Sequence, residues 1–445
     1  MEGNRRFEPG LVLAVLLVLA SLAPTAATIH RAPAVDYYHF WLVGQIVHSG
    51  EARDVYGREA RLELGETAYR RAFAPGGGKA QRRAATKFRR LETTATPFLY
   101  ASFFPFVSGD YDRDRVVFNA ASLLLFLFAA AAIAWRLGYG VTAVLVLLGL
   151  LLVAFEPLAS DLRVGNVNRL QFGLLAFYAA LLWRPAGRTA AGAAGAWIGL
   201  ASMWKPNLAF VAATVSFFWW LRGDSARLWA HLAGAALGVL AAFGCAAAFF
   251  GTPEVWVWWL EAAARLTDDF PVSVADGNFA PSHVLEQFYG IRLGLAWPLA
   301  IVALLGMALR HAAHRSGPGE HEGEILPLVG IGVAASLLAS PLAWLHYYLL
   351  SVFLVLWALR PDGAERVVPW AQRMVAVAAV VAVSMGPVLQ LFVTSAPGLW
   401  AGFGNGGLVL LLVLGLVDLG RMGRGGVAAD TSAPTRALAG GPAGG

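Results

Sequence analysis

Long, nearly uninterrupted runs of apolar residues recur from one end of the chain to the other. A helix needs about 20 such residues to cross the hydrocarbon core of a bilayer. Runs near that length, separated by short polar connections, predict an all-α polytopic membrane protein. The pattern predicts twelve spans: 11–29, 115–135, 140–158, 167–183, 189–204, 207–221, 228–250, 291–309, 325–341, 345–359, 369–392 and 404–420.

The composition agrees with a membrane protein and excludes several other classes. Of the 445 residues, 58% are hydrophobic and 14% are charged, whereas about a quarter are charged in a typical soluble domain. The net charge of +6 does not indicate nucleic-acid binding, because the basic residues lie between spans and in one loop. The single cysteine, Cys245, lies in an apolar run, so a disulfide framework is not possible.

The two ends of the chain differ in character. Arg5 and Arg6 precede the apolar run 11–23, an arrangement that resembles a signal peptide. The run continues with small residues toward Ile29, which favours an uncleaved first helix. Residues 425–445 are rich in Gly, Ala and Pro and are predicted to be a disordered cytoplasmic tail after a single transmembrane domain, 1–424.

Basic residues divide the connections into two groups. Because lysine and arginine are retained on the cytoplasmic side, the richer group predicts that both termini are cytoplasmic. The richer group holds Arg5, Arg6, Arg136, Arg184, Arg188, Arg222, Arg227, Arg310, Arg315, Arg360, Arg366, Arg421 and Arg424, whereas the short connections of the other group hold Arg163, Lys205 and Arg265.

The first outer connection, residues 30–96, is an exception that carries twelve lysines and arginines. Loops longer than about 60 residues escape the charge bias. Within it, Tyr37 to His48 predicts a short interfacial helix with its aromatic side chains toward lipid, and 54–73 is again helix-like. The apolar stretch 97–108 is too short to cross the bilayer, so we expect a re-entrant or surface-lying segment.

The unusual polar clusters all fall on the extracytoplasmic side of this topology. Asp36 follows the first span beside several aromatic residues. A carboxylate next to lipid is costly to keep without a function, and it can act as a general base. The other clusters lie in 161–169, 204–207, 268–278 and 340–347. Their common side predicts one site that is open to the outer water layer and accessible to lipid.

Each cluster also has a structural interpretation, and the local sequence leaves both open. Asp36 is placed to cap the helix that follows it, and Lys205 to extend to the membrane interface as readily as to bind phosphate. Asn166 and Asn168 suit hydrogen bonds between helices. His346, beside a tryptophan and two tyrosines, suits the membrane interface.

Asp112-Arg113-Asp114 has the D-x-D form that many sugar-nucleotide enzymes use. Three characters match easily by chance. The metal in such enzymes offsets the charge of a diphosphate, which a monophosphate donor does not require. The chain also has no cysteine–histidine metal pattern and no Walker loop, so we expect neither a metal nor another cofactor.

Together these residues resemble glycosyltransferase family 87, the polyprenyl-phosphate-dependent membrane mannosyltransferases of the GT-C fold. The resemblance runs in matching order from about residue 30 to residue 350. Asn166 stands where that family usually has glutamine, and Tyr347 replaces a second histidine. The motifs are Asp36-Tyr-Tyr-His-Phe-Trp41, Gly165-Asn-Val-Asn168, Lys205-Pro206, Gly277-Asn278 with Ser282, and Ser340-Pro-Leu-Ala-Trp-Leu-His346.

The resemblance implies a metal-independent, inverting glycosyltransferase of the bacterial inner membrane. Its donor is expected to be a hexose linked to polyprenyl phosphate, with mannose as the first expectation for the hexose. Its acceptor is expected to be a hydroxyl of a glycolipid or polysaccharide. Asp36 is the expected general base, with His346 as a proton relay or phosphate ligand. The expected phosphate ligands are Lys205, Arg163 and Arg169; the expected sugar or acceptor contacts are Tyr37, Tyr38, Trp41, Asn166, Asn168, Asn278 and Trp344.

The main alternative is a transporter or flippase of lipids or glycans. Such proteins place ionisable and helix-breaking residues near mid-membrane, often in paired repeats. Here the polar clusters lie at one face and the span interiors are nearly free of acidic residues. This distribution favours the transferase.

Overall fold

Each of the twelve predicted spans overlaps a helix in the computed structural model, which describes residues 9–51, 53–183, 187–265, 272–315, 323–361, 368–386 and 397–422. The predicted tail 425–445 lies outside these residues. The helices are α1 (Pro9–Arg31), α2 (Val35–His48), α3 (Arg58–Phe73), α4 (Lys79–Lys87), α5 (Pro97–Phe103), α6 (Tyr111–Arg136), α7 (Val141–Ala154), α8 (Glu156–Val164), α9 (Asn168–Leu182), α10 (Arg188–Trp204), α11 (Ala209–Leu221), α12 (Ser225–Phe250), α13 (Val255–Ala264), α15 (Pro281–Tyr289), α16 (Ala296–Arg315), α17 (Ile325–Ala339), α18 (Val352–Ala358), α19 (Trp370–Ser384) and α21 (Pro397–Leu419), with short 3-10 helices η1 (Phe104–Phe106), η2 (Pro206–Leu208) and η3 (Leu345–Ser351).

Five of the described helices are long and apolar enough to cross a membrane. They are α1, α6, α12, α16 and α21, and the count becomes six if the bent pair α7 and α8 forms one span. The helices at the other predicted spans have at most 17 residues. A helix of that length is about 25 Å long, somewhat less than the hydrocarbon thickness of about 30 Å. Twelve crossings would therefore need these shorter helices as well.

The predicted span 140–158 is broken rather than continuous. α7 and α8 meet at an angle of 60°, with Phe155 between them in an extended conformation. Pro157 explains the break, because it has no N–H to donate to the carbonyl of Val153 and is well suited to the first turn of a new helix. As a result Asp161, expected in a connecting loop, lies on α8.

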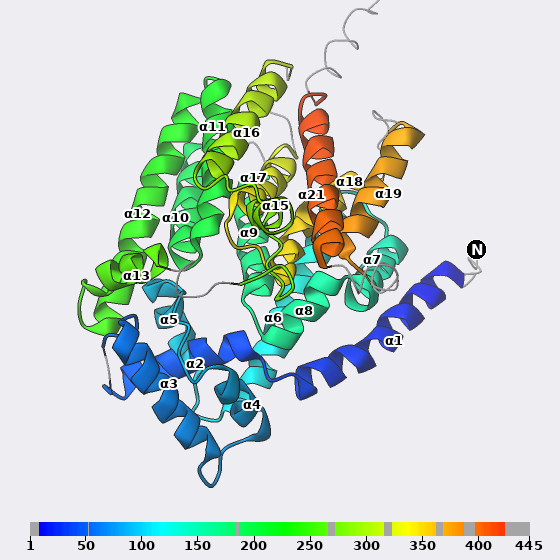
Figure 1. Ribbon diagram of the computed structural model, residues 1–445. Coiled ribbons are helices and arrows are strands. Elements are labelled where there is room, and N and C mark those ends of the chain that lie inside the picture. Colours follow the sequence, from blue (N-terminus) through cyan, green and yellow to red (C-terminus); the bar gives the residue numbers. More distant parts are fainter. Residues whose placement is uncertain are drawn as a thin grey trace, which may run out of the picture.

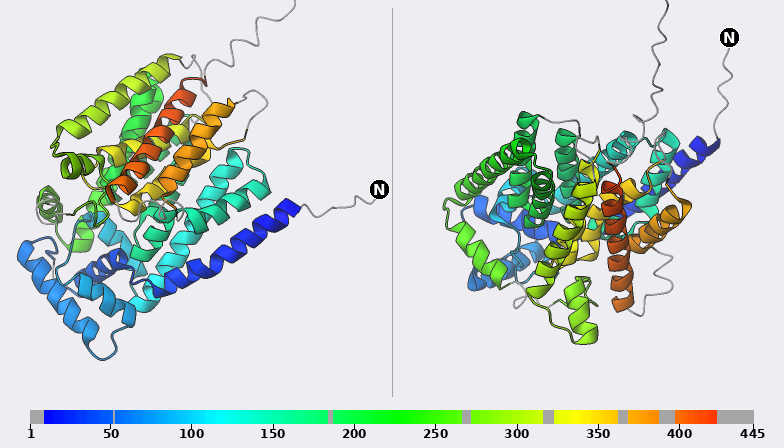
Figure 2. Two further views of the ribbon diagram at one scale, coloured as in Figure 1. Left: turned by 45° about the vertical axis from the view of Figure 1, so that its right-hand side comes forward. Right: turned by 90° about the horizontal axis from the view of Figure 1, so that it is seen from above.

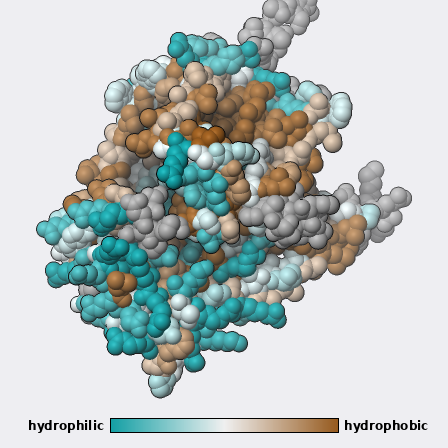
Figure 3. Space-filling view, viewed as in Figure 1, coloured by the Kyte–Doolittle hydropathy of each residue, from teal (hydrophilic) through white to brown (hydrophobic). Residues whose placement is uncertain are grey.

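The helices of the first outer connection form a layer at one end of the bundle. α2, α3, α4 and α5 lie together below the other helices in Figure 1, and α1 runs along the edge of the molecule (Figures 1 and 2). Hydrophilic side chains cover this layer, while hydrophobic ones dominate the body above it (Figure 3). The predicted helix at Tyr37 to His48 is confirmed as α2, and most of 54–73 is α3.

The orientation predicted for the aromatic residues of α2 is wrong. Tyr37, Tyr38, Phe40 and Trp41 are each at most 2% exposed. Their rings form a separate apolar core with residues of α4, α5 and the start of α6. Each large ring removes more apolar area from water when it packs against other side chains on several sides. The outer layer is thus a folded unit with its own interior, held against α10 and α12.

Three arginines at helix ends each contact the end of another helix. Arg222 at the end of α11 pairs with Glu324 before α17, at 2.8 Å. Arg360, just after α18, pairs with Asp418 near the end of α21, at 2.9 Å. Arg136 at the end of α6 lies over the ring of Trp183, just after α9. Each contact joins two helix ends that were predicted to share a side.

Candidate active site

The junction between α1 and α2 fixes the position of Asp36. Ala34, between the two helices, has a left-handed conformation with φ of 52°. The Arg115 guanidinium donates to the carbonyls of Ile29 and Ala32 at the end of α1, at 2.8 and 3.0 Å. The Tyr111 hydroxyl donates to the Ala34 carbonyl at 2.8 Å. These contacts from α6 hold the start of α2, and Asp36 lies in its first turn.

Gly165 brings the end of α8 against this junction. It caps α8 with a φ of 68°, a conformation that glycine adopts without steric cost. A Cβ at this position would lie 2.7 Å from the Cβ of Ala34 and 3.0 Å from the Cβ of Tyr37. Only a residue without a side chain permits this approach, and the next residue, Asn166, therefore reaches Asp36.

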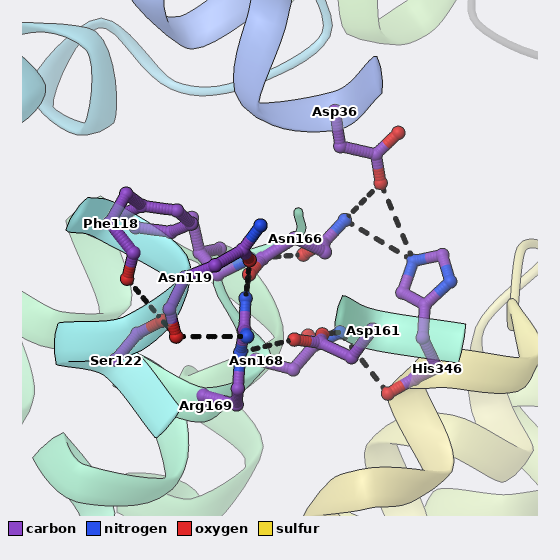
Figure 4. Close-up of polar contacts among 10 residues, drawn as sticks. Asp36, Phe118, Asn119, Ser122, Asp161, Asn166, Asn168, Arg169 and His346 are labelled. Atoms are coloured by element: carbon purple, nitrogen blue, oxygen red, sulfur yellow. Dashed lines mark hydrogen bonds and ion pairs between the residues drawn. The ribbon is translucent and has the colours of Figure 1, made fainter. Parts of the chain in front are cut away.

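Asp36, Asn166 and His346 form the centre of the site (Figure 4). The Asn166 Nδ2 group donates to Oδ2 of Asp36 at 2.6 Å and lies 3.2 Å from Nε2 of His346. The His346 Nε2 atom is itself 3.7 Å from Oδ2 of Asp36. The N–H of Val167 donates to Oδ1 of Asn166, which fixes the orientation of the amide. Nε2 of His346 is thus an acceptor, and its proton lies on Nδ1.

A buried ion pair lies directly beneath these residues. Asp161 and Arg169 are both 0% exposed, and Oδ1 lies 2.8 Å from Nε. Arg169 also donates to Oδ1 of Asn119 at 2.6 Å. Asn168 donates to Oδ2 of Asp161 at 2.9 Å and to the backbone carbonyl of His346 at 3.2 Å. The pair therefore anchors the segment that carries Asn166 and supports the backbone of His346 (Figure 4).

Two cations set the electrostatics around Asp36. Burial raises the pKa of the Asp36 carboxyl to about 6, while the hydrogen bond from Asn166 and the charges of Lys205 and Lys87 oppose the rise. Burial lowers the pKa of the Lys205 ammonium to about 8, against the effects of Asp36 and Asp161. At neutral pH the carboxyl is thus largely ionised and the ammonium is charged.

Lys205 is half-buried beside the residue that follows His346. Its ammonium lies over the ring of Tyr347, 4.9 Å from the centroid. No carboxylate of the described residues comes within 4.0 Å of it. A charged ammonium without an ion-pair partner is available to an anionic ligand.

Trp344 caps η3, which carries His346, and Asn278 holds the segment before this helix in place. The two rings are nearly parallel, 9° apart, with centroids at 6.2 Å. Asn278 forms an antiparallel bridge with Trp344, and its amide bonds the N–H of Ala343 and the carbonyl of Pro341. The 272–280 segment therefore sets the position of the aromatic side chain beside His346.

The structure brings together some of the predicted site residues and separates others. Asp36, Asn166 and His346 contact one another, Trp344 lies beside His346, and Lys205 lies over the adjacent Tyr347. Asp36 is not the N-cap of α2, a position that Ala34 occupies. The remaining predicted residues have other partners. Tyr37, Tyr38 and Trp41 lie in the core of the outer layer. Arg169 pairs with Asp161, half-exposed Arg163 pairs with Glu156, and the side chains of Asn168 and Asn278 form hydrogen bonds with the protein backbone.

The two carboxylates of the D-x-D sequence and the nearby Asp110 have partners within the protein. Asp110 caps α6 through the N–H of Arg113, and Asp112 pairs with Arg115 at 3.2 Å. Asp114 is buried and accepts from Trp41 Nε1 at 3.0 Å and from the backbone N–H of Ser108 at 2.7 Å. These carboxylates hold α6 against the outer layer.

Sequence reasoning assigned no role to Asp161 or Lys87. Asp161 was noticed only as part of a polar loop, because its partner lies eight positions away on another helix. Lys87 is exposed on α4, and its charge opposes the rise in the pKa of Asp36; nothing in the local sequence connects it with that residue.

Fold and site first define a class: a polytopic helical membrane protein whose polar centre lies at one end of the bundle. The particular family follows from the sequence profile of glycosyltransferase family 87, which matches residues 94–341, more than half of the chain. The chain belongs to this family and is a membrane glycosyltransferase of the GT-C class. Neither a search of curated proteins nor a search of solved structures finds a match. Asp36 and His346 lie outside the matched residues, so their roles depend on the geometry.

Proposed function

We propose that this glycosyltransferase moves a hexose, with mannose as the first expectation, from a polyprenyl-phosphate carrier to a hydroxyl group of a glycolipid or polysaccharide. The observation that carries the proposal is the meeting of Asp36, Asn166 and His346 from three distant parts of the chain. The carboxylate there is partly desolvated and partly exposed, and it lies near the Lys205 ammonium, which has no ion-pair partner within the described part of the chain.

The proposed step is a single displacement with inversion. The acceptor hydroxyl gives its proton to the Asp36 carboxylate as its oxygen bonds to the anomeric carbon. The bond from that carbon to the phosphate oxygen breaks, and the phosphate leaves with the electron pair and one additional negative charge. General-base assistance of this kind is worth about 10²–10⁴-fold, and a pKa near 6 keeps the base ionised at neutral pH.

Lys205 is the proposed cation for the departing phosphate. A fixed positive charge stabilises negative charge that develops in the transition state, and this ammonium lies near Asp36 without an ion-pair partner among the described residues. Arg163 is a second candidate, because its side chain is 49% exposed. Trp344, half-buried beside His346, offers an aromatic face for the sugar.

His346, Asn168 and Asn278 have positioning roles in this proposal. Nε2 of His346 receives a hydrogen bond from Asn166 and so holds the amide that orients Asp36. Asn168 supports the His346 carbonyl, and Asn278 supports the Trp344 loop. The proposal thus moves these two asparagines from sugar contacts to support of the site.

The topology is part of the same proposal. We place the site end outside the cytoplasm and the arginine-rich ends inside, with both termini cytoplasmic, since basic residues are retained on the inner side. The shorter apolar helices, such as Ile325–Ala339, which is buried along its whole length, then complete twelve passes. Helices that are surrounded by protein need no full hydrophobic match to lipid.

The test is transfer by the purified full-length protein with a panel of polyprenyl-phosphate sugars. Wild type should transfer one donor well, and Asp36→Asn should lose at least about a hundredfold in turnover while it still binds the donor. Glu63→Gln, an exposed carboxylate change in the same outer layer, is the matched control. Near-normal turnover by Asp36→Asn would remove the assignment of the base, and inactivity of wild type with every donor would remove the proposed donor class.

A further inference from the structure

A groove lies at the end of the bundle opposite the candidate active site. It has a volume of about 640 Å³ and lies between α11 and α16. α11 begins just after Lys205, and its 13 residues carry the chain about 20 Å away from it. Both helices rise to the upper end of the molecule in Figure 1, whereas α2 lies at the lower end. The lining residues are Phe217, Trp220, Leu221, Gly306, Met307, Arg310 and His314.

The body of the groove is apolar and open to the surroundings. Trp220 is 61% exposed and Met307 is 62% exposed. Gly306 leaves open space at the floor of the groove, since a Cβ at this position would come no closer than 3.9 Å to the ring of Phe217. A larger side chain at this position would occupy the groove itself. These features fit an extended hydrocarbon chain that lies along α16.

One end of the groove carries the positive charge of Arg310, which no described carboxylate neutralises. Arg310 and His314 are four residues apart and thus lie on one face of α16. The neighbouring arginines are already paired, Arg222 with Glu324 and Arg227 with Asp224. Among the described residues no carboxylate lies within ion-pair distance of Arg310.

We infer that this groove binds an anionic phospholipid of the bilayer. The phosphate lies at Arg310 and His314, one acyl chain follows Gly306 and Met307, and Trp220 lies at the level of the headgroups, where tryptophan is favoured. On the proposed topology this end faces the cytoplasmic leaflet, which carries the anionic lipids. The inference is independent of the reaction at Asp36, and its failure would leave that proposal unchanged.

The test measures lipid binding to the delipidated full-length protein by native mass spectrometry, with phosphatidylglycerol against phosphatidylcholine. Wild type should retain one phosphatidylglycerol molecule preferentially. Arg310→Gln should lower that preference roughly fivefold, because one basic residue near a lipid surface contributes about that much. Gly306→Leu should lower binding of both lipids. Arg315→Gln, on the same helix but outside the groove, should match wild type.

Two outcomes would overturn the inference. One is an unchanged preference in Arg310→Gln, and the other is an equal loss in Arg315→Gln, which would show a diffuse charge effect. Phosphatidylglycerol with brominated chains gives a second measurement that does not require the Gly306 variant to fold. It should quench the fluorescence of wild type more than that of Trp220→Phe, and equal quenching would also contradict the inference.

Discussion

Two carboxylates at the same end of the bundle have opposite surroundings. The Asp161 side chain is 0% exposed, pairs with Arg169 and accepts a hydrogen bond from Asn168. The Asp36 side chain is 23% exposed and accepts one hydrogen bond, from Asn166. The two acids are connected through the short segment between α8 and α9, so they differ in partners rather than in location.

The difference shows which acid is available for chemistry. The Asp161 carboxylate is fully buried, and both of its oxygens already have partners, Oδ1 in Arg169 and Oδ2 in Asn168. Burial also raises the pKa of the Asp36 carboxyl, to about 6, but its side chain is 23% exposed, so part of its surface stays open to a substrate. Asp161 thus supports the site, and this difference is why we propose Asp36, rather than Asp161, as the base.

The largest effect is expected from removal of the structural acid. Asp161→Ala leaves the Arg169 guanidinium buried without a counter-ion, which costs about 3–5 kcal/mol of stability. The free energy of unfolding should fall accordingly, as measured by denaturation in detergent. The double change Asp161→Leu with Arg169→Met removes both charges and should recover much of the loss. An Asp161→Ala protein that is fully stable yet inactive would reverse the comparison.

Gly165 tests the connection between the two acids. Gly165→Ala places a Cβ 2.7 Å from the Cβ of Ala34, so α8 must move and Asn166 must leave Asp36. A displacement of about 1 Å can lower turnover by roughly a hundredfold. Gly50→Ala is the matched control, because Gly50 has a similar φ of 73° with nothing within 4 Å of its Cβ position. Equal activity of the two variants would contradict the role of the close approach.

The smallest effect concerns the pH dependence, which reports on Asp36 and Lys205. The value of kcat/KM should rise as pH increases through about 6, where Asp36 loses its proton, and fall as pH increases through about 8, where Lys205 loses its own. In Lys205→Arg the guanidinium stays charged, so the alkaline limb should disappear while the acid limb remains. Lys79→Arg, an exposed lysine change in α4, should keep both limbs.

Much of the helical framework was accessible from the sequence, because apolar runs of span length have few alternatives to a helix in a membrane. The helix at Tyr37 to His48 was also predicted correctly, but its aromatic side chains were expected to face lipid. Local sequence does not distinguish a lipid-facing ring from one packed against another helix, since both environments are apolar. The partners of these rings come from α4, α5 and α6.

The predicted site residues fall into two groups, and local sequence does not distinguish them either. Asp36, Asn166, Lys205, His346 and Trp344 were singled out from local sequence and lie together. Arg169, Asn168 and Asn278 were also singled out, yet their polar atoms bind the chain itself. A polar residue near a membrane surface looks the same in sequence whether its partner is a ligand or another part of the protein.

The sequence by itself determined that this is a polytopic helical membrane protein, where most of its helices lie, and, through its profile, that it is a family 87 glycosyltransferase. Only the tertiary structure decided that Asp36 has no lysine or arginine ion-pair partner among the described residues, because it meets Asn166 and His346 across separations of 130 and 310 positions along the chain. Apolar periodicity is a local property of the chain, whereas the charge and solvation of a carboxylate depend on every group that folding brings around it.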